Sequence, residues 1–126
     1  MDFSLSDELM MIRDGVSRFV SDVYSFEARR DLVDGEDGFS RENWRQFAEL
    51  GWLGAALPEA YGGVGLGPRA SMVIMQELGK GLVLEPYLAT VILGAETIAR
   101  FGNEGQKDAI LPQVAAGEVL LSLAHA

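Results

Sequence analysis

The chain has 126 residues, of which 48% are hydrophobic, so it can bury the core of one domain but not that of a large multidomain enzyme. Its 19 acidic and 10 basic residues give a net charge of -9, which argues against binding to nucleic acid or to an anionic membrane surface, because both partners need clustered Lys and Arg. The absence of cysteine excludes disulfides, zinc–thiolate sites and iron–sulfur clusters.

The only histidine, His125, stands beside the last residue of the sequence, and a catalytic triad built on it is therefore not expected. No segment reaches the roughly 18 uninterrupted apolar residues of a transmembrane helix. The first residues are acidic and amphipathic, unlike the basic start of a signal peptide. These features predict a cytoplasmic protein that is neither exported nor inserted in a membrane.

A long amphipathic helix is predicted at the start of the chain. Ser6 is a suitable N-cap, and apolar residues recur after it at steps of three and four, which predicts a helix over residues 6–29. We interpret its apolar stripe as core, and a helix for a partner's groove is the alternative. Residues 31–38 are acidic and contain glycine, so they are predicted to form an exposed connection.

A second helix is predicted over residues 41–50. Ser40 is its N-cap, and Phe39 and Trp44 have the spacing of a hydrophobic staple. Gly51 is placed to take the left-handed conformation that ends a helix.

Residues 51–67 carry six glycines and one proline, a density that predicts a structured loop. Gly63, Gly65 and Gly67 do not match the spacing of a phosphate-binding loop, and no lysine follows them. Tight turns that let helices pack closely are the favoured interpretation, and nucleotide-phosphate binding is the alternative.

The next helix is predicted to begin at Gly67-Pro68 and to end near Lys80. Met72 and Met75 lie on its apolar face. Methionine at helical spacing usually belongs to the core, but its flexibility also suits a pocket that adapts to an alkyl chain.

Residues 87–101, after Pro86, are apolar on nearly every side, which predicts a helix in the centre of a bundle. Thr90 and Gly94 lie four residues apart on the strip that begins at Pro86, so one side of this helix carries small side chains. The space beside the strip could be filled by a neighbouring backbone or by the alkyl chain of a ligand.

A short helix follows, introduced by the capping-box spacing of Asn103 and Gln106 and running through Leu111. Pro112 is predicted to bend or end it before a further turn to Gly117.

Residues 119–124 are an apolar run that predicts a β-strand, and a single strand leaves its backbone groups unpaired. We therefore expect two parts: an all-α domain of about five to six helices over residues 1–118, and the first strand of a β domain over residues 119–126. The other strands are expected beyond this sequence or in another chain.

Two sequence motifs are specific for a protein family when they are taken together. The run LGWLGAALPEAYGG lies between predicted helices, and GNEGQKDAILPQVAAGE precedes the predicted strand. In this order and separation they resemble the N-terminal helical domain of the acyl-CoA dehydrogenase family, and the resemblance covers essentially the whole chain.

The resemblance implies an FAD-dependent enzyme that desaturates acyl-CoA thioesters, in which a glutamate removes the α-proton and the flavin accepts the β-hydride. It also implies a subunit with an N-terminal helical domain, a small β domain and a C-terminal four-helix bundle, assembled as a tetramer that passes electrons to an electron-transfer flavoprotein. The family's catalytic glutamate lies in the C-terminal bundle, so no carboxylate of this chain is assigned that role.

The resemblance also implies positions for substrate and cofactor. The family's acyl-pocket segment matches the small-residue strip and the residues before it, namely Leu82, Pro86, Tyr87, Thr90, Val91 and Gly94. The family's flavin-contacting strand matches the end of the chain, with cofactor contacts implied at Leu123, His125 and Ala126.

The end of this chain departs from the family pattern, because the aromatic residue and the threonine of that strand are both missing. Ala126 cannot donate the threonine's hydroxyl hydrogen bond, so either main-chain contacts suffice or the chain is a diverged subunit. This departure and the run ELGKGLVLEPYLAT are similar to the smaller subunits of two-chain bacterial enzymes such as pimeloyl-CoA dehydrogenase. The functional alternative is a diverged non-catalytic subunit or a helical assembly module.

Overall fold

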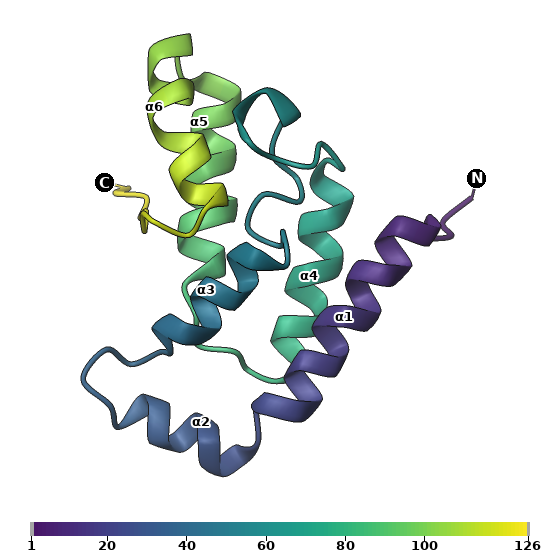
Figure 1. Ribbon diagram of the computed structural model, residues 1–126, viewed down its shortest axis with the longest axis vertical. Coiled ribbons are helices and arrows are strands. Elements are labelled where there is room, and N and C mark those ends of the chain that lie inside the picture. The colour runs from purple at the N-terminus through teal and green to yellow at the C-terminus, as the bar shows by residue number, and fades with distance from the viewer. Residues whose placement is uncertain (1, 126) are drawn as a thin grey trace.

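Two helices that lie side by side, α1 (Asp7–Val23) and α4 (Pro68–Lys80), form one side of the computed structural model, which describes residues 2–125 (Figure 1). They run in the same direction. At one end, the Arg69 side chain donates a hydrogen bond of 2.7 Å to the Ser4 carbonyl, and at the other end Gly81 lies against Val20. The apolar stripe predicted for α1 is core, with Leu9, Val16 and Phe19 buried.

The predicted helix over residues 6–29 is wrong in one respect, because it is broken into two. Tyr24 leaves the helical conformation at φ -99° and ψ 61°, and the Ser25 side chain then accepts a hydrogen bond from the Ala28 N–H and caps α2 (Phe26–Val33). This second helix extends into the predicted exposed connection. None of its residues is fully buried, so its sequence carries only a weak amphipathic signal.

The caps predicted around α3 (Arg41–Glu49) are confirmed. The Ser40 hydroxyl accepts from the Asn43 N–H at 3.1 Å, and Gly51 has the left-handed φ of 78°. At α1 the Ser6 hydroxyl likewise accepts from the Leu9 N–H at 3.3 Å.

Residues 51–67 form a structured loop as predicted, with one 3-10 turn, η1 (Glu59–Tyr61). The loop belongs to the core, because Leu53 and Leu57 are fully buried. A Cβ added to Gly63 would lie 2.0 Å from the Leu57 carbonyl oxygen, so only glycine fits there. This close approach supports the interpretation of tight turns.

The predicted central helix is present, but its first half is not α-helical. Residues Leu88–Ala95 form a π-helix, η2, which continues into α5 (Glu96–Phe101). A π-helix bonds each N–H to the carbonyl five residues back; it is rare and is frequent at functional sites. One face of η2 packs in the core, where Thr90, Val91 and Gly94 are buried. The predicted central place holds for that face only, because Leu88 and Leu93 are 50% and 40% exposed and α5 has no buried residue.

The last helix, α6 (Glu104–Ala115), packs along η2 and α5 (Figure 1). Its capping box is confirmed, with hydrogen bonds of 2.9 Å in both directions between Asn103 and Gln106. Pro112 does not end the helix, which continues to Ala115. Because Pro112 stands on the exposed side, the loss of one backbone hydrogen bond there leaves no buried group behind it.

Residues 2–125 contain no strand, and residues 118–125 form a C-terminal segment without regular secondary structure. A strand is defined by pairing, and the described part of the chain offers this segment no partner strand. The β-strand over residues 119–126 and the domain boundary at residue 118 therefore stay predictions.

An aromatic cluster joins α1, α3 and the loop after it. The ring centre of Phe19 lies 5.1 Å from that of Phe47 and 5.8 Å from that of Trp52, and the latter two rings are 5.2 Å apart. Aromatic pairs at such distances contribute about 0.5–1.5 kcal/mol each beyond the area they bury. This cluster fixes α3 against α1.

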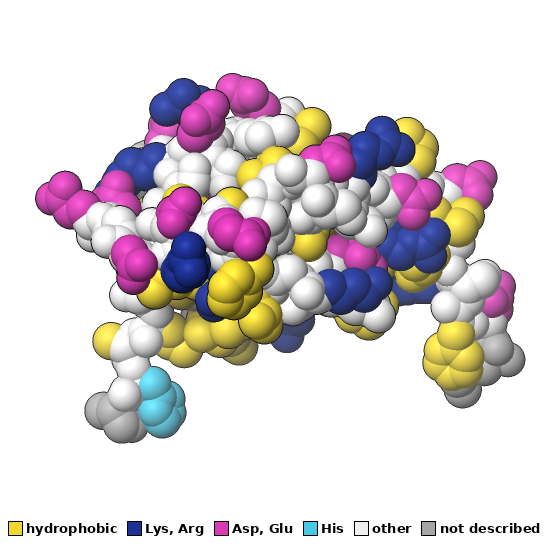
Figure 2. All heavy atoms as spheres, turned by 90° about the horizontal axis from the view of Figure 1, so that it is seen from below, with side chains coloured by type: hydrophobic (Ala, Val, Ile, Leu, Met, Phe, Trp, Pro, Cys, Tyr) yellow, Lys and Arg dark blue, Asp and Glu magenta, His cyan; other side chains and the backbone are white. Residues whose placement is uncertain are grey.

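The surface carries acidic, basic and apolar side chains interleaved on the face shown in Figure 2, with no single patch of one charge. None of the helices within residues 2–125 is long and apolar enough to cross a membrane.

Removing one ring of the aromatic cluster tests this view of the core. Phe47→Ala is expected to lower the free energy of unfolding by about 3–5 kcal/mol, because Phe47 is fully buried and leaves a cavity. Phe26→Ala is the matched control, since Phe26 is 75% exposed, and it should change the value by less than about 0.5 kcal/mol. Chemical denaturation measures both, and equal values for the two variants would contradict the assignment of the core.

Candidate functional site

The connector between α4 and η2, residues 81–87, is held by one side chain from the break between α1 and α2 and one from α2. The Tyr24 hydroxyl accepts from the Leu84 N–H at 3.0 Å and donates to the carboxylate of Glu85. Arg29 Nε donates to the Leu82 carbonyl at 2.8 Å. Leu82 itself has a φ of +50°, a conformation that L residues adopt only where their surroundings hold them. The contacts to both sides of it supply that restraint.

Glu85 is a carboxylic acid inside the protein, with 5% of its surface exposed. Burial raises its pKa above the ordinary value of 4.5, because the charged form loses its hydration, and the nearby Tyr24 hydroxyl and Asn43 amide oppose the shift without cancelling it. Its Oε1 atom is buried and has no hydrogen-bond partner among the described residues. Glu85 therefore joins the connector to α1 at the cost of a partly unsatisfied buried group.

An apolar hollow of about 340 Å³ lies between α4 and this connector. Arg29 stands at its polar side, and most of the other lining side chains are aliphatic. The hollow is lined by Arg29, Met75, Leu78, Gly79, Leu82, Val83, Leu84, Glu85, Tyr87 and Leu88.

A second hollow, of about 250 Å³, continues along the groove between α4 and η2. It shares two of its lining residues, Met75 and Leu88, with the first hollow, so the two are neighbours. At its far end the Ser71 hydroxyl donates to the Glu96 carboxylate at 2.7 Å. It is lined by Pro68, Ser71, Met72, Met75, Leu88, Ile92 and Glu96.

The structure separates the six predicted substrate residues into two groups. Leu82 and Tyr87 line the first hollow, and Pro86, between them in the sequence, is half-buried. The Tyr87 hydroxyl donates to the Trp52 carbonyl at 3.3 Å, and burial raises the pKa of Tyr87, so this side chain is a fixed, uncharged part of the wall.

The other three residues, Thr90, Val91 and Gly94, are buried and line neither hollow. The C-terminal segment lies over the strip, where a Cβ added to Gly94 would come within 2.6 Å of Leu121 Cβ. The Thr90 hydroxyl accepts from the Leu121 N–H at 3.2 Å and lies 3.4 Å from the Leu121 carbonyl, to which it donates. Leu121 therefore lies beside the strip, with its side chain against Gly94 and its backbone groups on the Thr90 hydroxyl.

The predicted cofactor residues lie beyond this contact. Leu123 and His125 are exposed on the C-terminal segment, and Ala126 lies outside the described residues. Within residues 2–125, the backbone groups of residues 122–125 form no hydrogen bonds. These groups are free to pair with a strand or with a planar ligand.

Sequence reasoning missed Tyr24, Arg29, Glu85 and Leu121, because their roles come from contacts between distant segments. One signal was present: Glu85 is a lone carboxylate within the apolar run LVLEPYL, and such a residue needs a partner if the run is buried.

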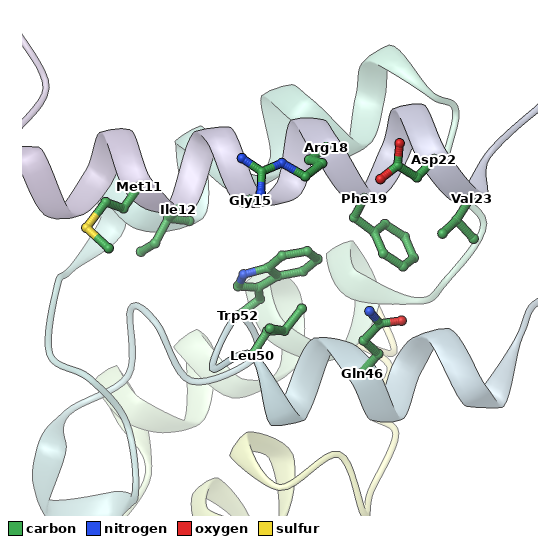
Figure 3. A pocket seen from close by; sticks show the side chains of 10 residues that line it. All are labelled: Met11, Ile12, Gly15, Arg18, Phe19, Asp22, Val23, Gln46, Leu50 and Trp52. Carbon is green, nitrogen blue, oxygen red and sulfur yellow. The ribbon is translucent and has the colours of Figure 1, made fainter.

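Another hollow, of about 460 Å³, lies between α1 and α3, away from the predicted site. Figure 3 shows Ile12 and Phe19 of α1 on one side of it and Leu50 and Trp52 on the other, and Arg18 beside Gly15. None of the predicted site residues lines it. Within residues 2–125, no group of three or more acidic or histidine side chains is placed to hold a metal ion.

The fold and site define a helical domain with two adjoining apolar hollows beside a buried π-helix, and comparison with known proteins agrees with the resemblance in the sequence. Residues 6–118 match the family model described as "Acyl-CoA dehydrogenase, N-terminal domain". The chain therefore belongs to the acyl-CoA dehydrogenase family, and the part matched is the N-terminal domain.

Comparison with individual relatives supports the same family assignment. The acyl-CoA dehydrogenase FadE27 of Mycobacterium tuberculosis is 32% identical over 124 residues, which cover 98% of this chain and 33% of the relative. The crystal structure of the ChsE4-ChsE5 complex from the same species is 32% identical with a TM-score of 0.89, covering 97% of this chain and 34% of that one. An acyl-CoA dehydrogenase complexed with FAD from Bacillus anthracis is 33% identical with a TM-score of 0.81, covering 94% and 21%. The chain thus spans about a third or less of the length of these relatives.

The buried carboxylate gives a pH-dependent prediction. The folded protein holds the Glu85 proton more tightly than the unfolded chain, so the stability contributed by this group falls as pH rises from 4.5 through its raised pKa. Glu85→Gln removes this fall. The free energy of unfolding of the variant should therefore increase relative to that of the parent protein as pH rises. Denaturation at a series of pH values measures the difference.

The control is Glu49→Gln. This carboxylate is exposed, so its replacement removes no buried acidic group. A difference between parent and Glu85→Gln that stays constant with pH, or that reverses in sign, would contradict the raised pKa of Glu85.

Proposed function

We propose that this chain forms the helical wall of the acyl pocket in an FAD-dependent acyl-CoA dehydrogenase, which desaturates an acyl-CoA thioester between its α and β carbons. The observation that carries the proposal is the pair of adjoining hollows between α4 and η2 in a chain of this family. Their linings are mainly aliphatic, and the first contains two of the positions implied by the resemblance, Leu82 and Tyr87.

The chemistry explains why such a wall matters. A proton next to a thioester can be removed only if the carbonyl is polarised and the acyl chain is held between the base and the flavin. In the proposal, Leu82, Met75 and Leu88 bind the alkyl chain and exclude water from it. Tyr87, held by its bond to the Trp52 carbonyl, keeps the wall rigid. The base lies outside this chain.

The end of the chain offers a flavin main-chain hydrogen bonds and one apolar side chain. The free backbone groups of residues 122–125 offer hydrogen bonds, and Leu123 offers an apolar surface, being 50% exposed. We propose that Leu123, His125 and Ala126 contact FAD in this way, since none of them supplies the hydroxyl found in the family pattern. When bound, FAD accepts the β-hydride of the substrate.

The partners proposed are an acyl-CoA substrate, an electron-transfer flavoprotein as electron acceptor, and further subunits in a homo- or hetero-tetramer. The similarity to a chain of the two-component ChsE4-ChsE5 complex supports a two-chain assembly. The proposed location is the cytoplasm.

A second candidate function is that of a diverged subunit or helical assembly module without catalytic activity. One observation favours it: the positions of the family's aromatic residue and threonine are occupied by Leu123 and Ala126.

The two candidates differ in flavin content. The native protein, purified at its full length with any subunit that accompanies it, is expected to contain flavin in a fixed ratio to the polypeptide, and its visible absorption should be bleached by an acyl-CoA. A colourless protein that stays tightly oligomeric would contradict the enzyme and favour the second candidate.

The acyl wall makes a separate prediction. Leu88 lines both hollows and is 50% exposed, so Leu88→Glu should be tolerated by the fold but should place a charge against the alkyl chain. We expect KM for the acyl-CoA to rise by about tenfold or more, the factor that corresponds to ~1.4 kcal/mol. Steady-state kinetics on the native assembly measures it.

Leu93→Glu is the matched control, because Leu93 stands on the same π-helix, is 40% exposed and lines neither hollow. Equal KM values for the two variants would rule out the proposed wall.

A further inference from the structure

Thr90 uses its hydroxyl in an unusual way for a residue in a buried helix. The side chain is fully buried, and its single oxygen both accepts from the N–H and donates to the carbonyl of Leu121, at 3.2 and 3.4 Å. These two bonds replace the pair that a neighbouring strand would make with Leu121. They are the only hydrogen bonds that the backbone of residues 119–125 makes to described residues.

Gly94 provides the second half of the contact. Leu121 Cβ and Cδ1 lie 2.6 and 3.0 Å from the place where a Cβ on Gly94 would stand, so the absence of a side chain lets Leu121 rest on the helix backbone. Val119 and Leu121 both pack on the core, whereas Leu120 between them is 41% exposed. Alternate residues of the segment therefore pack on the core, as they do in a strand that has one buried face.

The contact of the C-terminal segment with η2 and the core ends at Leu121. Residues 122–125 are exposed and form no backbone hydrogen bonds within the described chain. Leu123 follows the seated residue by two positions, about 7 Å along an extended chain. The interaction that fixes the position of Leu121 on η2 therefore also determines where residues 122–125 lie.

We propose that Thr90 is a positioning residue: through its two hydrogen bonds to Leu121, and with Gly94 as the bare surface beside it, it sets the register of residues 119–125 on η2. The acyl-pocket helix and the segment that leads to Leu123 and His125 are thereby one rigid unit. The consequence for a flavin rests on the proposed function, whereas the register itself does not.

The direct test is amide hydrogen exchange at Leu121 in the native protein. Thr90→Val keeps the shape of the side chain but removes both hydrogen bonds, and exchange at Leu121 should become about tenfold faster, the factor that corresponds to ~1.4 kcal/mol. Thr90→Ser keeps the hydroxyl and should restore slow exchange. Thr97→Val, at the only other threonine and on the adjoining helix α5, should leave Leu121 unchanged.

Two results would overturn the proposal: unchanged exchange at Leu121 in Thr90→Val, or fast exchange in Thr90→Ser. If Thr90→Val also loosens the amides of α1, a second variant decides. Gly94→Ala leaves the hydroxyl in place but pushes Leu121 away, so Leu121 exchange should rise while α1 stays protected. Gly79→Ala is its control, since a Cβ there meets nothing within 4 Å. Equal Leu121 exchange in the two alanine variants would also overturn the proposal.

The flavin gives an independent readout. If the proposed function holds, Thr90→Val should shift the visible absorption bands or the reduction potential of bound flavin, and Thr90→Ser should restore them. A protein without flavin would defeat the proposed function and leave the exchange result standing, whereas altered flavin with unchanged Leu121 exchange would defeat the register proposal alone.

Discussion

The arrangement depends on one close approach, that of Leu121 to the bare backbone of η2. Most buried helices keep their neighbours at the distance set by side chains, but here Gly94 has none and Thr90 offers a hydroxyl to the approaching backbone. A larger residue at position 94 would lift the C-terminal segment off the helix. The small-residue strip therefore serves packing first, and the apolar hollows are displaced to the opposite flank, between η2 and α4.

A second constraint comes from Tyr24, whose position explains two features at once. Tyr24 leaves the helical conformation and ends α1 where the apolar periodicity alone would continue, and its hydroxyl bonds to Leu84 and Glu85. The same hydroxyl holds the connector that forms one wall of the first hollow. The break in the helix thus coincides with the residue that holds a distant loop, and the Glu85 carboxylate in that loop keeps one buried oxygen without a partner among the described residues.

Features encoded within a few residues could be predicted from the sequence. The caps at Ser6, Ser40 and Asn103, the structured glycine loop and the central apolar helix all follow from local chemistry. The break at Tyr24 could not, because the hydroxyl of Tyr24 bonds to Leu84 and Glu85, about 60 residues along the chain. The π-helical geometry of η2 has no local signal in the sequence either. The same limit applies to the site. The resemblance implied Leu82 and Tyr87, which line the first hollow, but no local pattern indicates the contact of Leu121 with Gly94, because the two residues are far apart in the sequence.

The central claim is that one helix, η2, faces the acyl chain on one flank and seats the flavin-directed segment on the other. An experimental structure of the native protein with a bound, unreactive acyl-CoA analogue tests it most directly. The account predicts an acyl chain in contact with Leu82 and Leu88, while Leu121 still rests on Gly94. An acyl chain that displaces Leu121 from Gly94, or one bound away from α4 and η2, would contradict it.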